Sequence, residues 1–180
     1  MKLIQNLQSG RSMVEMLGVL AIIGVLSVAG IAGYSKAMAK FKQSKLLDQI
    51  STLSTNIRTA FANQADYTDL SKEAIINMGL IDDTMKVLNN DGTVSLTEIR
   101  NVYGGSVEVA LISGRMSFIL RFTGIPKDAC VIFGTTDWGY KDNNRRVSIN
   151  GRINEGGISM AEFVAEHCTE SSNTIGLTAS

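Results

Sequence analysis

Residues able to carry out chemistry are few and scattered in this sequence. Catalysis needs a base beside a nucleophile, two carboxylates sharing a pocket, or a cluster of metal ligands. The only histidine, His167, has no ligand residues clustered around it, and Asp82-Asp83 is expected to form a solvated turn. No glycine-rich loop ends in Lys-Ser or Lys-Thr, as a phosphate-binding loop does. The sequence therefore predicts no enzyme, no catalytic residue, no metal site and no cofactor.

One carboxylate stands where a charge is costly. Glu15 directly precedes residues 16–35, a run of 20 residues without a formal charge. At about 1.5 Å per residue, a helix of that length spans roughly 30 Å, the thickness of the hydrocarbon core of a bilayer. An acidic group entering that phase costs about 3 kcal/mol unless it is paired. We therefore expect Glu15 to have a positively charged partner.

The apolar run continues into an amphipathic segment without an intervening proline. Its apolar residues recur at spacings of three and four, which indicates one stripe of a helix: Leu47, Ile50, Leu53, Ile57 and Phe61. We predict a single helix from Ser12 to about Ala62, with its first half uncovered and its second half packed on a head. The first half carries small residues that allow close helix packing: Gly18, Ala21, Gly24, Ser27, Gly30 and Gly33.

The front end of the chain resembles the signature of type IV prepilins. A short polar leader ends in Gly10, and Glu15 is the fifth residue counted from Arg11. The resemblance implies that a prepilin peptidase cuts between Gly10 and Arg11, and that Glu15 neutralises the terminal amine of Arg11 in a neighbouring subunit. A single unpaired charge in an apolar filament core would cost far more free energy than the ion pair. Members of the family usually have an apolar, often methylated residue at the position of Arg11, so methylation is left open.

Two further features bear on the subclass of pilin. The family often has a proline where this chain has Ala32, and its absence, together with the long head, favours the type IVb class. The short leader, in contrast, favours the class of type IV pilins that is not type IVb.

Two other interpretations of the front end stay open. In a secretory signal peptide, Lys2 and Arg11 would form the basic region, and residues 27–29 the cleavage site. In a plain membrane anchor, the helix would hold a monomeric head. Glu15, directly beside the apolar run, is unexpected under both.

The charges give conflicting indications of location. The 17 basic and 17 acidic residues cancel, so nothing indicates a nucleic-acid partner. More lysines follow the apolar run than precede it, which by the positive-inside tendency would leave the head in the cytoplasm: Lys36, Lys40, Lys42 and Lys45. The leader and the cysteines favour the opposite side, and the lysines are then the surface of a long helix.

The two cysteines, Cys130 and Cys168, lie in the same half of the chain. If the head is periplasmic or extracellular, they would form a disulfide that closes a loop of about 40 residues and stabilises the fold by roughly 4 kcal/mol. The alternative is a pair of free buried thiols. Because the spacing is not C-x-x-C, a zinc site is not indicated.

The head is predicted to combine short helices with antiparallel strands. Ser71 and Gly79 delimit a short helix, and Ser159 caps another that runs to Cys168. Residues 106–112 and 116–122 form the clearest hairpin, and a second is centred on Asn150-Gly151. A helix is expected over residues 126–133, with Pro126 in its first turn, and a last strand over residues 174–179.

The segment from Val87 to Glu98 partly matches a calcium-binding EF-hand loop. Val87, however, occupies the first ligand position and has no side-chain oxygen. A turn between two strands is therefore the preferred interpretation.

Landmarks of the head also resemble type IVb pilins and their conjugative thin-pilus relatives. They are residues 103–107, Ile125-Pro126 before Ala129-Cys130, and His167-Cys168 followed by residues 173–175. The resemblance implies that the segment bounded by the cysteines is surface-exposed and sets subunit contacts. Residues 137–140 and 143–146 are then the candidates for exposed interaction loops, the alternative being that Trp138 and Tyr140 belong to the core.

Together these observations predict an α+β pilin fold, in which a long N-terminal helix packs by its second half on an antiparallel sheet. The expected organisation is a leader at residues 1–10, a helix at 11–62 with 16–35 as membrane span and filament core, and a head at 63–180. The expected function is that of a type IV pilus subunit, held in the bacterial inner membrane and then exported as an extracellular homo-oligomeric filament. Its expected partners are the prepilin peptidase and the pilus assembly machinery, and no nucleic acid. Alternatives are a minor pilin, a type II secretion pseudopilin, or a signal-cleaved secreted binding domain.

Overall fold

The structure, a computed structural model, describes residues 13–112, 114–139 and 146–180. Its helices are α1 (Met13–Ala60), α2 (Lys72–Asn77), the 3-10 turn η1 (Asp83–Met85), α3 (Lys127–Thr135) and α5 (Met160–His167). Its strands are β1 (Lys86–Leu88), β2 (Val94–Ile99), β3 (Val107–Ile112), β4 (Ser117–Ile125), β5 (Val147–Ile149), β6 (Arg152–Ile153) and β7 (Asn173–Ala179). The predicted α+β architecture, a long helix followed by an antiparallel sheet, is confirmed.

Helix α1 is continuous over 48 residues. The chain divides into two compact units between Phe41 and Lys42, so the head unit, Lys42–Ser180, includes the second part of α1. In this part Leu46, Ile50 and Ile57 are fully buried. The predicted stripe therefore starts at Leu46, and Leu47 is only partly buried, because the helix surface rotates by about 100° per residue.

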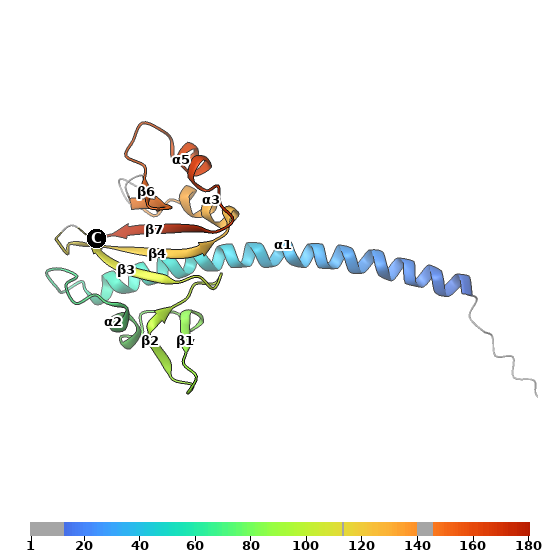
Figure 1. Cartoon of the computed structure of the whole chain (residues 1–180), viewed down its shortest axis with the longest axis horizontal. Coiled ribbons are helices and arrows are strands. Elements are labelled where there is room, and N and C mark those ends of the chain that lie inside the picture. The colour runs from blue at the N-terminus through green and yellow to red at the C-terminus, as the bar shows by residue number, and fades with distance from the viewer. Residues whose placement is uncertain (1–12, 113, 140–145) are drawn as a thin grey trace, which may run out of the picture. The chain divides into compact units, whose positions relative to one another are not determined.

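The main sheet of the head has the strand order β3-β4-β7-β5-β6, and all its pairs are antiparallel. Strands β3, β4 and β7 lie side by side in Figure 1. Residues alternate across it as the pleat requires. Val107 pairs with Phe122 and both are buried, whereas their neighbours Glu108 and Arg121 pair on the exposed side. The C-terminal strand β7 lies in the middle of the sheet, so the sheet is complete only when the end of the chain is in place.

Strands β1 and β2 form a separate two-stranded sheet. The turn that joins them is held by Asp91, whose carboxylate accepts hydrogen bonds from the backbone N–H of Thr93 at 2.9 Å and from its hydroxyl at 2.6 Å. The predicted turn between strands is thus confirmed. Glu98, the twelfth position of the EF-hand comparison, lies on β2 and outside this turn.

The helix caps follow the sequence signals closely. The hydroxyl of Ser71 accepts a hydrogen bond from the N–H of Ala74, and that of Ser159 accepts one from Glu162. Pro126 lies at the N-cap of α3, one position before the first turn in which it was expected. Helices α3 and α5 pack closely, since a Cβ added at Gly134 of α3 would meet the side chain of Val164.

Candidate functional site

The first part of α1 presents an apolar surface that no other described residue of the first unit covers. The side chains of residues 13–37 are all exposed, and that of Val25 is 71% accessible. Among the described residues, α1 contains the one helix segment that is long and apolar enough to cross a membrane, by length and composition alone. Core helices of soluble proteins and signal sequences can meet the same criterion, but none of this segment is buried.

The two serine hydroxyls of the described part of this segment are satisfied locally. The hydroxyl of Ser27 donates to the carbonyl of Ile23 at 2.8 Å, and that of Ser35 donates to Ile31 at 2.9 Å. At Gly18, Gly24 and Gly30 an added Cβ would meet nothing within 4 Å. The helix therefore presents small and apolar surface on which both serine hydroxyls are satisfied, as packing against lipid or other helices requires.

Glu15 lies in the first turn of α1. A carboxylate in this place interacts favourably with the positive end of the helix dipole. Gly10 and Arg11, the predicted cleavage residues, lie outside the described residues, so the cleavage and the pairing of Glu15 with the amine of Arg11 stay predictions.

The C-terminal part of the head is closed by a disulfide between Cys130, on α3, and Cys168, which follows α5. Their Cα atoms are 5.8 Å apart, within the usual range, and both residues are buried. The disulfide expected for a head outside the cytoplasm is therefore present in the structure, and the alternative of two free thiols is not.

A network of asparagine side chains surrounds this closure. The amide of Asn150 donates to the carbonyl of His167 and to the side-chain oxygen of Asn173, both at 3.0 Å. Asn173 is 1% exposed, and its amide donates to the carbonyls of Ile125 and Glu170. Asn150 adopts a positive φ of 51° at the β5–β6 turn, a conformation that asparagine tolerates. The predicted hairpin at Asn150-Gly151 is confirmed. The side chain of Asn150 also joins this turn to the end of α5.

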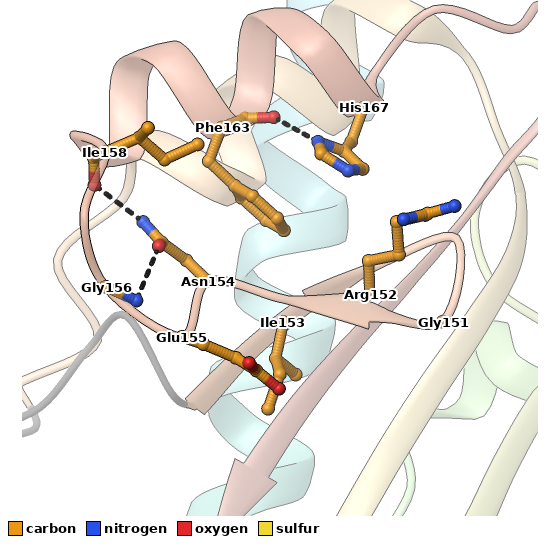
Figure 2. Close-up of a pocket in the computed structure, with 9 residues that line it drawn as sticks. All are labelled: Gly151, Arg152, Ile153, Asn154, Glu155, Gly156, Ile158, Phe163 and His167. Carbon is orange, nitrogen blue, oxygen red and sulfur yellow. Dashed lines mark hydrogen bonds between the residues drawn. The ribbon is translucent and has the colours of Figure 1, made fainter.

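A pocket lies between β6, the following loop and α5 (Figure 2). His167 stacks on Phe163 with ring centroids 4.4 Å apart, and its Nδ1 donates to the Phe163 carbonyl at 2.9 Å. Asn154, 2% exposed, donates to the Ile158 carbonyl and accepts from Gly156. These polar side chains form hydrogen bonds with the backbone of the loop after β6 and of α5. Within the described residues, no three His, Cys, Asp or Glu side chains come together as metal ligands would.

The segment between the cysteines is less exposed than expected. All three residues of β5 are buried, because this strand pairs with β7 in the sheet. Trp138 packs against Phe133 with centroids 5.2 Å apart, and its indole N–H donates to the Phe133 carbonyl at 3.2 Å. Trp138 is therefore partly buried against the core, between the two interpretations, whereas Asp137 and Gly139 are exposed. Tyr140 and residues 143–145 lie outside the described residues.

Two polar contacts of α1 within the head were not predicted from the sequence. Gln49 is 1% exposed, and its side-chain oxygen accepts from the backbone N–H of Val102 at 3.1 Å. Lys45 forms an ion pair with Asp82 at 2.6 Å. Asp82 is thus not simply part of a solvated turn. Asp82 is the N-cap residue of η1, and the preference for aspartate at N-caps is the one local signal that could have predicted a structural role for it.

A long N-terminal helix, apolar and exposed in its first part, followed by a head built on an antiparallel sheet defines the pilin class of structural subunits. The sequence model of the Bundlin family, a family of pilins, matches residues 36–171. The chain therefore belongs to the Bundlin family. A search of the curated proteins found no match to the chain. Since the family is one of structural proteins, it argues against an enzyme.

Proposed function

We propose that this pilin polymerises into a type IV pilus of the type IVb kind after a prepilin peptidase has cut between Gly10 and Arg11. Before assembly the protein is anchored in the bacterial inner membrane by residues 16–35. The assembly machinery then moves it into an extracellular filament in which these helix segments form the core. The single observation that carries the proposal is the exposed apolar segment of α1 with Glu15 in its first turn.

The exposed segment supports polymerisation because water is a poor environment for it. A contiguous apolar surface of this length needs lipid or other protein around it. Transfer from the membrane to a bundle of identical helices exposes no additional apolar surface, and the glycines allow close approach. Assembly then depends on specific contacts between subunits.

Glu15 supplies one such contact in the proposal. Its carboxylate pairs with the terminal amine of Arg11 in a neighbouring subunit, in an environment where either charge alone is costly. The pair therefore favours one register of neighbouring helices over others. The side chain of Arg11 adds a second positive charge next to this pair.

The experiment that tests the proposal compares Glu15→Ala with Glu162→Ala. Both variants remove one carboxylate, but Glu162 lies on the exposed surface of α5 in the head. We expect Glu15→Ala to enter the membrane and fold its head, yet to be missing from sheared filaments, whereas Glu162→Ala is incorporated. A wild-type yield of filaments from Glu15→Ala refutes the charge pair.

A second experiment tests the cleavage. Substitution of Gly10 is expected to leave the leader uncut, and the mass of the accumulated protein reports this directly. The amino terminus of protein from surface filaments should be Arg11, whereas a start near Gly30 would indicate a secreted, signal-cleaved domain. The abundance of the chain in the filaments separates a major subunit from a minor pilin or a pseudopilin.

A further inference from the structure

The four lysines that follow the apolar segment belong to different units of the structure. Lys42 and Lys45 lie in the head unit, where the Lys42 Nζ is 5.8 Å from the centroid of the Tyr103 ring and Lys45 pairs with Asp82. Lys36 and Lys40 lie in the first unit, and both are exposed. The head therefore accounts for two of these charges and leaves the other two to be explained.

The first unit offers Lys36 and Lys40 no acidic partner near them. In residues 13–41 the only acidic residue is Glu15, 21 positions before Lys36. At about 1.5 Å per residue, that places it roughly 30 Å away along the helix. The same holds for an identical helix segment lying in register beside it. No acidic side chain of this helix segment therefore neutralises the two lysines, and their charges are exposed to whatever surrounds the helix.

The position of the two lysines matches the boundary of a membrane. Lys36 directly follows the uncharged run, and Lys40 lies one turn further on the same side of the helix. Tyr34 and Phe41, 68% and 61% exposed, are seven residues apart and share the opposite side. Tyrosine rings are enriched at the level of the lipid headgroups. Long lysine side chains near the ends of membrane-spanning helices extend their ammonium groups to the same level.

We propose that Lys36 and Lys40 bind the phosphate groups of anionic phospholipids where α1 leaves the hydrocarbon core. The inference rests on the proposed function, since it requires that α1 spans the membrane before assembly. Each ammonium group donates up to three hydrogen bonds and carries a full positive charge, which suits a phosphate. Each lysine near an anionic surface favours binding by roughly fivefold, so the pair provides a preference of about 25-fold.

The test uses the full chain in mild detergent with equimolar phosphatidylglycerol and phosphatidylcholine, and counts the retained lipids by native mass spectrometry. The wild type should retain phosphatidylglycerol over phosphatidylcholine by about 25-fold, and added salt should reduce this ratio. The double variant Lys36→Gln/Lys40→Gln should lose the preference. The control Lys127→Gln/Arg152→Gln removes two exposed charges from the head and should keep it.

Flotation with vesicles of pure phosphatidylcholine separates the two proposals. If the wild type does not float with these vesicles, the membrane anchor of the proposed function fails, and the lipid site with it. If all variants float but Lys36→Gln/Lys40→Gln keeps its preference for phosphatidylglycerol, the lipid site is overturned and the anchor stands. An unchanged melting temperature of the head in the double variant shows that neither lysine is needed for folding.

Discussion

The Nζ atom of Lys45 on α1 lies 2.6 Å from a carboxylate oxygen of Asp82. The other oxygen of Asp82 accepts hydrogen bonds from the backbone N–H and the hydroxyl of Thr84, at 2.8 and 2.7 Å, and so caps η1. One carboxylate thus joins the segment after α2 to the long helix. The hydrogen bond from Lys45, followed by those from Thr84, lowers the pKa of Asp82 to about 2, and the hydrogen bond to Asp82 raises the pKa of Lys45.

This pair predicts how the stability of the head depends on acid. The pKa of Asp82 in the folded protein is about 2, below its ordinary value of 3.8, so the ionised form stabilises the fold above pH 3.8 and this contribution is lost as the pH falls toward 2. The melting temperature of the wild type should therefore fall more steeply over this range than that of Asp82→Asn. Asp83→Asn, whose side chain is 91% exposed, is the control and should follow the wild type. Parallel curves for the wild type and Asp82→Asn would contradict the assignment.

The disulfide predicts a large loss of stability on reduction. Replacing Cys130 and Cys168 with alanine should lower the free energy of unfolding by about 4 kcal/mol, because the open loop of the unfolded chain gains entropy. Denaturant titration of the full chain measures this. Reduced wild-type protein should unfold at the same denaturant concentration as the double variant. A reduced protein as stable as the oxidised one would show that packing alone holds α3 and α5 together.

The local elements of the fold were predictable because their signals are local. The 3.6-residue repeat of apolar residues located the second part of α1, and the serine caps located α2 and α5. The alternation in residues 106–112 and 116–122 located the β3–β4 hairpin. These patterns do not depend on what the elements later contact.

The parts that escaped prediction are set by contacts between residues distant in the sequence. The central place of β7 follows from its pairing with both β4 and β5, which no local pattern encodes. Burial of Gln49 depends on an N–H at Val102, and Trp138 is drawn toward the core by Phe133. The assembly residues are a separate case, because Glu15 was identified from its place beside the apolar run, and the predicted assembly partner, the amine of Arg11, lies outside the described residues.

Gly105 predicts a substitution that the fold will not tolerate. A Cβ at this position would collide with the carbonyl oxygen of Thr123, a backbone atom that cannot move without breaking its hydrogen bond from the side chain of Asn101 at 2.8 Å. Gly105→Ala should therefore destabilise the head by about 3 kcal/mol or more. The neighbouring Gly104→Ala is the control. The Cβ added at Gly104 has no neighbour within 4 Å, so the only cost is that of an alanine at a positive φ of 83°, about 1 kcal/mol. Equal melting temperatures for the two variants would refute the collision.

Gln49 predicts the cost of removing one buried polar group from α1. Gln49→Leu keeps a side chain of similar size but leaves the backbone N–H of Val102 without its acceptor, which lies 3.1 Å away in the wild type. An unsatisfied, partly buried donor costs about 1–3 kcal/mol, more than the added apolar contact returns. The free energy of unfolding from denaturant titration should fall by that amount.

The matched control for this substitution lies two turns earlier on the same helix. Gln43→Leu makes the same chemical change at a partly exposed position whose side chain makes no hydrogen bond with the other described residues of the head, so its effect should stay within about 0.5 kcal/mol. Hydrogen exchange gives an independent measurement, since the amide of Val102 should lose protection in Gln49→Leu and keep it in Gln43→Leu. If Gln49→Leu is as stable as Gln43→Leu and Val102 stays protected, the contact between α1 and the segment after β2 does not depend on this hydrogen bond.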